Sequence, residues 1–184
     1  MLQRIFQCRG DNFKMWKRRT FHECAEELEA LSQDFRDAYI NDLNLDQQDQ
    51  ERILHESSER GIEILRVLAL SIRSEQDFGV IPSIRVTVGA LKRSASTSEV
   101  SATLSSYQPP YSERTGFEPL LLREALNKIA HADPYRAGFF ADNTVHDLIL
   151  SGNQGSNTWI AIVSLPDLCR AIKSLPDQNV QSVR

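Results

Sequence analysis

The stretch Phe21-His-Glu-Cys-Ala-Glu-Glu-Leu-Glu-Ala-Leu-Ser-Gln-Asp-Phe-Arg-Asp-Ala-Tyr39 carries apolar residues at spacings of three and four, the period of an amphipathic helix. The same pattern extends over residues 12–42. A second such pattern begins after Leu45 or Asp46 and runs to about Ser74. Because only a few residues join the two, we predict a long antiparallel helical hairpin.

The apolar period changes after this hairpin. Apolar and polar residues alternate over residues 83–88, which predicts a strand. A second alternation follows over residues 100–104, inside a segment, 93–112, that holds seven serines. This segment is either the second strand of a β-hairpin or a mobile linker, and the sequence leaves both interpretations open.

The last third of the chain predicts a helix, a β-hairpin and another helix. Pro119 stands in the first turn of the first helix, which ends near Asp133 because Pro134 follows. Two strand patterns flank a turn-rich stretch, residues 151–157, and Pro166 begins the final helix. The second strand is apolar on both faces, so we expect a central position for it, with Trp159 packed over the preceding helix.

The predicted fold class is therefore α+β, with helix dominant. The predicted organisation is a helical hairpin, then short strands with a Ser/Pro-rich loop, then a helix–hairpin–helix unit that packs on the first part as one domain, and a frayed tail. The respective ranges are 1–78, 79–118, 119–177 and 178–184.

The composition is that of an ordinary globular protein. The 184 residues are 41% hydrophobic and 25% charged, and no apolar run approaches the roughly 18 residues of a membrane span. The N-terminus is too polar for a signal-peptide core, so we expect a cytoplasmic protein. The cysteines, Cys8, Cys24 and Cys169, are odd in number and far apart, which predicts reduced thiols.

Charge is distributed unevenly along the chain. Residues 1–20 carry six basic groups and one acid, whereas residues 21–60 carry twelve acids and three arginines. Lys17, Arg18 and Arg19 follow a tryptophan, a composition found where aromatic side chains stack on single-stranded nucleic acid. The basic arm could equally fold back onto an acidic helix of its own or another subunit.

The motif most indicative of chemistry lies in the helix after Pro119. Arg123, Asn127 and His131 are spaced i, i+4 and i+8, so a helix would align them on one stripe. A histidine can act as acid or base near neutral pH, and a guanidinium binds phosphate with a bidentate fork. With the amide as the orienting group, the three could cleave RNA without a metal. Lys128 and Arg136 could extend the phosphate track.

This motif resembles that of the HEPN superfamily, helical domains of ribonucleases, toxins and nucleotide-associated modules, whose signature is an arginine and a histidine on one helix. Here seven residues separate Arg123 from His131, against four to six in the family, and Glu124 follows the arginine. The resemblance implies RNA as substrate or ligand, and a homodimer whose site is composed across the two subunits.

Two alternatives remain open at this point. The Arg123 stripe could simply tie its helix to neighbouring elements, and the chain could be a non-enzymatic interaction or dimerisation module built on its acidic hairpin. We expect no metal and no small-molecule cofactor, because no phosphate loop, dinucleotide fingerprint or HExxH motif is present. Pairs such as His146 and Asp147 could contribute to a metal site only if the fold brought them together with others.

Overall fold

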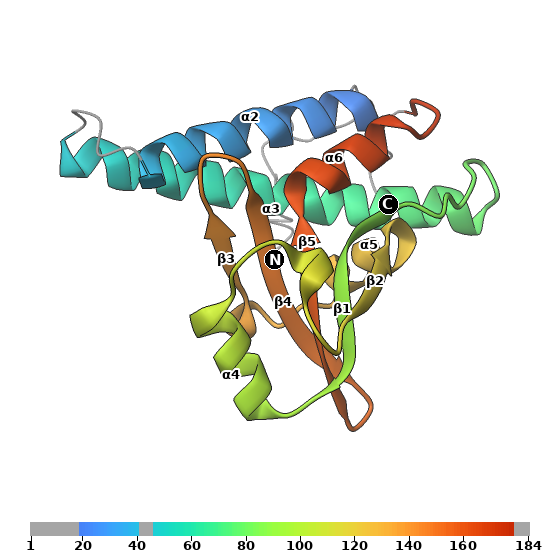
Figure 1. The fold of residues 1–184 in the computed structure, drawn as a ribbon. Helices are drawn as coiled ribbons and strands as arrows, with labels where there is room; N and C mark the ends of the chain where they lie inside the picture. Colours follow the sequence, from blue (N-terminus) through green and yellow to red (C-terminus); the bar gives the residue numbers. More distant parts are fainter. Residues whose placement is uncertain (1–18, 41–45, 179–184) are drawn as a thin grey trace, which may run out of the picture.

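The computed structural model describes residues 19–40 and 46–178, in which helices lie against a twisted antiparallel sheet (Figure 1). The predicted α+β class, with helix dominant, is confirmed. The helical hairpin is formed by α2 (Phe21–Ile40) and α3 (Gln47–Asp77). Asp46 caps α3, because its side chain accepts a hydrogen bond from the backbone N–H of Asp49 at 2.8 Å.

Five strands of the described residues form one sheet with the order β2-β1-β5-β4-β3, and every neighbouring pair is antiparallel. The strands are β1 (Thr87–Ala95), β2 (Glu118–Leu121), β3 (Gly138–Ala141), β4 (His146–Gln154) and β5 (Asn157–Ser164). The predicted hairpin corresponds to β4 and β5, and its turn is shorter than expected, with Gly155 at φ +61°. The central position predicted for β5 is confirmed.

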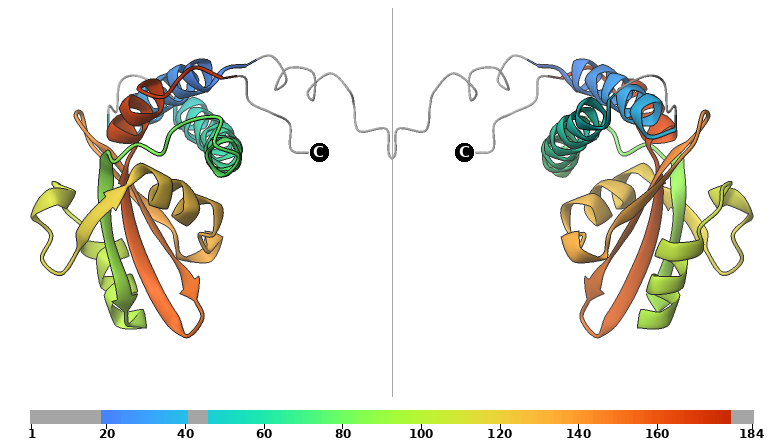
Figure 2. Two further views of the ribbon diagram at one scale, coloured as in Figure 1. Left: turned by 90° about the vertical axis from the view of Figure 1, so that its right-hand side faces the viewer. Right: turned by 90° about the vertical axis from the view of Figure 1, so that its left-hand side faces the viewer.

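The two faces of β5 are covered by different layers. Trp159, Ala161 and Val163 face the core shared with α2, α3, α5 (Leu122–Ala130) and α6 (Leu165–Lys173). Ile160 and Ile162 face a second apolar cluster, which α4 (Thr97–Ser106) covers. Figure 2 shows α4 on the opposite side of the sheet from α5. The molecule therefore has a thick helical layer, a sheet and a thin outer cover.

The predicted second strand over residues 100–104 is wrong, and so is the linker alternative: this segment is α4. Its start is fixed by a capping box, in which the Ser96 hydroxyl accepts from the Glu99 N–H and the Glu99 carboxylate accepts from the Ser96 N–H. Val100 and Tyr107 then pack on the sheet at helical spacing. Only two residues of the first predicted strand, Thr87 and Val88, belong to β1.

The predicted start of the third helix at Pro119 is also wrong. Residues 118–121 form β2, and α5 begins at Leu122. Proline lacks the N–H that an interior strand needs, but β2 lies at the edge of the sheet, where a proline is tolerated. The segment thus contributes one strand before the helix begins.

Some predicted features lie outside the described residues. These are residues 12–18 and 41–42 of the first predicted helix, the side chains of Lys17 and Arg18, Cys8, and positions 179–184 of the predicted tail. Gln178 is described, and its carbonyl accepts a hydrogen bond from the N–H of Phe21 at 2.8 Å. Among the described helices, none combines the length and apolarity that crossing a membrane requires.

The approach of β1 to β5 leaves no room for a side chain at Gly89, since a Cβ there would collide with the carbonyl oxygen of Ile162. We expect Gly89→Ala to lower the free energy of unfolding by about 3 kcal/mol, because backbone atoms would have to separate. Urea denaturation followed by circular dichroism measures this change.

Gly61→Ala is the matched control, because a Cβ there makes an ordinary contact, 3.8 Å from Leu28 Cδ1. Alanine favours helix over glycine by up to about 1 kcal/mol, so this variant should be neutral or stabilised. Equal effects of the two substitutions would contradict the close packing of β1 on β5.

Candidate functional site

The Arg123 side chain connects α5 to the end of α3. Its Nη1 donates a hydrogen bond to Oε1 of Gln76 at 3.1 Å, and its Nη2 forms an ion pair with Asp77. The guanidinium is therefore partly neutralised by a carboxylate of the same chain. Such a half-exposed pair contributes at most about 1 kcal/mol to stability, but it orients the first turn of α5.

The predicted stripe does not continue to His131, because α5 ends at Ala130. His131 is the C-cap, with φ −118° and ψ 14°, and its side chain is exposed. Asn127 is half-buried, and neither its amide nor the His131 ring forms a hydrogen bond with another described residue. The structure thus holds Arg123 in an ion pair and leaves the imidazole beyond the helix.

The cations expected to extend a phosphate track have different surroundings. Lys128 is buried, with its Nζ 4.6 Å from the centroid of the Trp159 ring, and this burial lowers the pKa of its ammonium group. Trp159 therefore packs over α5, as predicted. Arg136 lies 3.7 Å from the Asp133 carboxylate, and Arg19 forms an ion pair with Glu27.

An apolar pocket of about 470 Å³ lies next to the end of α5, between the helical hairpin and the outer half of the sheet. Strands β3 and β4 form its floor, α2 and α3 form its roof, and the segment 129–137 closes one side. Its main apolar walls are Leu28, Leu31, Phe35, Leu65, Leu148 and Leu150. None of Arg123, Asn127 and His131 is among its lining residues.

The pocket has a buried polar group at one end. His146, on β4, shares a hydrogen bond of 2.9 Å between its Nδ1 and the Ser32 hydroxyl of α2. Its ring stacks on Phe35 at a centroid distance of 5.1 Å and meets the edge of Phe139. Burial, with the charge of Arg36 as a smaller cause, lowers the pKa of His146 to about 4. The imidazole is therefore neutral at pH 7.

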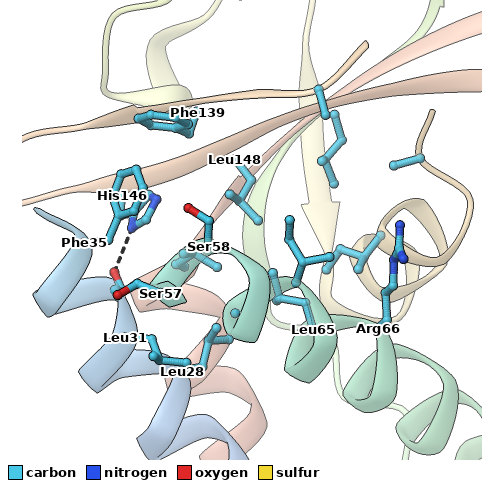
Figure 3. Close-up of a pocket in the computed structure, with 18 of the residues that line it drawn as sticks. Leu28, Leu31, Phe35, Ser57, Ser58, Leu65, Arg66, Phe139, His146 and Leu148 are labelled. Carbon is cyan, nitrogen blue, oxygen red and sulfur yellow. Dashed lines mark hydrogen bonds between the residues drawn. The ribbon is translucent and has the colours of Figure 1, made fainter. Parts of the chain in front are cut away.

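The other end of the pocket carries a positive charge. Arg66, an exposed residue of α3, lies far from His146 and Phe139 in Figure 3, beyond Leu65 and Leu148. Within the described part of the chain, its guanidinium has neither a hydrogen bond nor an ion pair. The pocket thus combines an apolar body, a neutral polar end and a cation without a counter-ion.

His146 and Asp147 do not form a common site, because consecutive residues of a strand point to opposite faces. On the far face the Tyr107 hydroxyl donates to Asp147 Oδ2 at 2.6 Å, and burial raises the pKa of that carboxyl. No group of three or more possible metal ligands occurs in residues 19–40 and 46–178. The free thiols of Cys24 and Cys169 are buried, which raises their pKa values to about 11 and about 12.

Sequence reasoning missed the pocket, although a signal was present. Ser32 and Ser57 occupy core-facing positions of their helices, where an aliphatic residue would be expected. A glycine, Gly61, follows Ser57 on the same face of α3. Small and polar residues in an apolar stripe leave space that larger side chains would fill.

Comparison of the chain with protein-family models, curated proteins and solved structures finds no match. The geometry of the described residues therefore carries the functional argument.

The depressed pKa of His146 makes stability depend on pH. The unfolded chain binds a proton near the ordinary value of 6.5, whereas the folded chain binds it only near 4. Stability is therefore fully present above pH 6.5 and is lost as pH falls toward 4. We expect His146→Gln to cost stability at pH 7, and this cost to shrink by about 2–3 kcal/mol at pH 4.5.

Urea denaturation of both proteins at several pH values between 7 and 4.5 measures the difference. The other titrating groups are common to both chains and cancel in the comparison. A difference that stays constant over this range would show that His146 is not desolvated.

Proposed function

We propose that this chain is a non-enzymatic binding module whose pocket takes an amphipathic organic anion. The observation that carries the proposal is Arg66, a cation without a partner among the described residues, at the edge of a pocket whose body is apolar. The apolar body of a ligand would contact the aliphatic walls of the pocket, and its anionic head would pair with the guanidinium of Arg66.

Size and charge support this proposal. Ligand pockets usually measure about 300–1,000 Å³, and the volume here is about 470 Å³. The acid three residues before Arg66 on the same helix has its own partner, because Glu63 pairs with Arg60 at 3.0 Å. Arg66 is therefore the cation at the pocket that remains for a ligand.

Metal-independent cleavage of RNA stays a prediction of the sequence. It requires Arg123 and His131 to act on one phosphate, and the ion pair of Arg123 with Asp77 competes with that role. The burial of Lys128 removes one cation from the proposed track. The exposed imidazole of His131 is the feature that this hypothesis retains.

Dodecanoate is a suitable probe of the proposed function. We expect isothermal titration calorimetry to detect one site per chain, and Arg66→Gln to weaken binding on the order of tenfold, because a charge-assisted hydrogen bond is lost. Ala137→Trp should abolish binding, since this exposed residue lines the pocket and an indole there would obstruct it.

Two matched controls accompany these variants. Arg73→Gln removes another α3 arginine that lacks an ion pair within the described chain and does not line the pocket. Ala102→Trp places the same indole on α4, across the sheet. Neither should change the affinity, and equal losses in the variants and controls would refute the pocket as the site.

Self-association is a second candidate, because apolar side chains are exposed along α3. Ile62 and Leu70 are 50% and 48% exposed, and they lie eight residues apart on one i+4 ridge, with Arg66 between them. Such ridges pack into each other when helices cross. A second copy crossing α3 at Leu70 would pack the two Leu70 side chains against each other.

We expect size-exclusion chromatography with light scattering to report a dimer for the wild type and a monomer for Leu70→Lys, because a buried unpaired ammonium group disfavours the contact. Tyr39→Lys is the control, since Tyr39 is 51% exposed on α2, away from the ridge. A wild type that is monomeric at high concentration would exclude this second candidate.

A further inference from the structure

The inner end of the pocket contains a ring nitrogen with no partner. His146 is 7% exposed, and its Nδ1 is occupied by the Ser32 hydroxyl. No described residue forms a hydrogen bond with its Nε2. Figure 3 shows this second nitrogen turned away from the Ser32 bond, toward the part of the pocket where Ser58 and Leu148 lie. A ring nitrogen with no protein partner at the end of an apolar pocket is a position where a ligand can form a hydrogen bond.

The Ser58 hydroxyl supplies a second polar atom at the same place. It donates a hydrogen bond to the carbonyl oxygen of Leu54 at 2.6 Å, which leaves its lone pairs free to accept. In Figure 3 the hydroxyl points from α3 into the pocket, on the side of the His146 ring. A ligand group between them could bond to both side chains.

We infer that the ligand of this pocket carries a hydroxyl group at the end opposite its anionic head, and that it is an elongated ω-hydroxy aliphatic carboxylate. The inference rests on the proposed function, because it takes Arg66 as the partner of the carboxylate. It adds that His146 Nε2 and Ser58 Oγ recognise the far end of the chain.

A hydroxyl suits this position because it both donates and accepts. It can donate to Ser58 Oγ while it accepts from Nε2–H, or donate to an unprotonated Nε2 while the Ser32 bond holds the proton on Nδ1. A second carboxylate would have to shed its hydration in an apolar enclosure beside a neutral imidazole. A plain methyl end would leave His146 Nε2 without a partner.

The distance between the two ends fixes the length of the ligand. Ser58 and Arg66 are eight residues apart on α3, which corresponds to about 12 Å along the helix axis. The arginine side chain adds reach at the outer end. An extended chain of the length of dodecanoate spans this distance, and the aliphatic walls between the ends enclose its methylene groups.

The test compares 12-hydroxydodecanoate with dodecanoate on the full chain by isothermal titration calorimetry. We expect the hydroxylated ligand to bind on the order of tenfold more tightly, which corresponds to one buried hydrogen bond gained. Arg66→Gln should weaken both ligands by the same factor and leave their ratio unchanged.

The hydroxyl preference should shrink in Ser58→Ala and disappear in His146→Phe, whose ring keeps the stacking on Phe35 but offers no nitrogen. Circular dichroism checks that each variant is folded. Should His146→Phe fail to fold, the comparison of the two ligands on the wild type and on Ser58→Ala still tests whether the pocket recognises the hydroxyl group.

Two outcomes separate the inference from the proposed function. Binding of dodecanoate with an affinity equal to or higher than that of 12-hydroxydodecanoate would overturn the inference and leave the anion-binding pocket standing. Absence of binding for both ligands, or binding that Ala137→Trp does not affect, would overturn both.

Discussion

Strand β5 is buried on both of its faces, and the other elements are arranged to cover one face or the other. Tryptophan and small or β-branched residues on its helical side pack under α5 and α6, while Ile160 and Ile162 require the separate cover of α4. The close approach of β1, which only a glycine at position 89 permits, fixes the register of β5 against β1. The β4–β5 hairpin fixes the register of β5 against β4. The pocket lies where the helical hairpin passes over the outer strands, beyond the part of the sheet that α5 and α6 cover directly.

The elements predicted correctly are those whose signal is local and repeated. The hairpin α2–α3 has an apolar stripe over many turns, and the β4–β5 hairpin has two strand patterns around a glycine-bearing turn. The errors occur where a short segment fits two periods. Val100, Ala102 and Leu104 alternate like a strand, yet Val100, Leu104 and Tyr107 also fit one face of a helix. The capping box formed by Ser96 and Glu99 was the local signal that favoured the helix.

The Arg123 motif shows why residue spacing alone predicts a site poorly. The i, i+4, i+8 alignment requires a helix that continues through His131, and α5 ends at Ala130. His131 therefore leaves the helical direction, and the partner of Arg123 comes from α3, a contact no local pattern could specify. Lys128, which we predicted from the sequence to extend the phosphate track, is instead buried against Trp159. Each of these outcomes depends on tertiary packing between segments distant in the sequence.

The pocket is also formed by packing between segments distant in the sequence, but the fold shows which polar groups line it. Filling the space with aliphatic side chains would stabilise the core, so polar residues at Ser32, Ser58 and His146 carry a cost in stability. The Ser32–His146 bond offsets part of this cost and holds the ring in one orientation, with its other nitrogen toward the cavity. Burial keeps that ring neutral, whereas the guanidinium of Arg66 at the other end is exposed. The two ends of the pocket therefore differ in polarity and exposure, so the elongated ligand proposed above would bind in one direction.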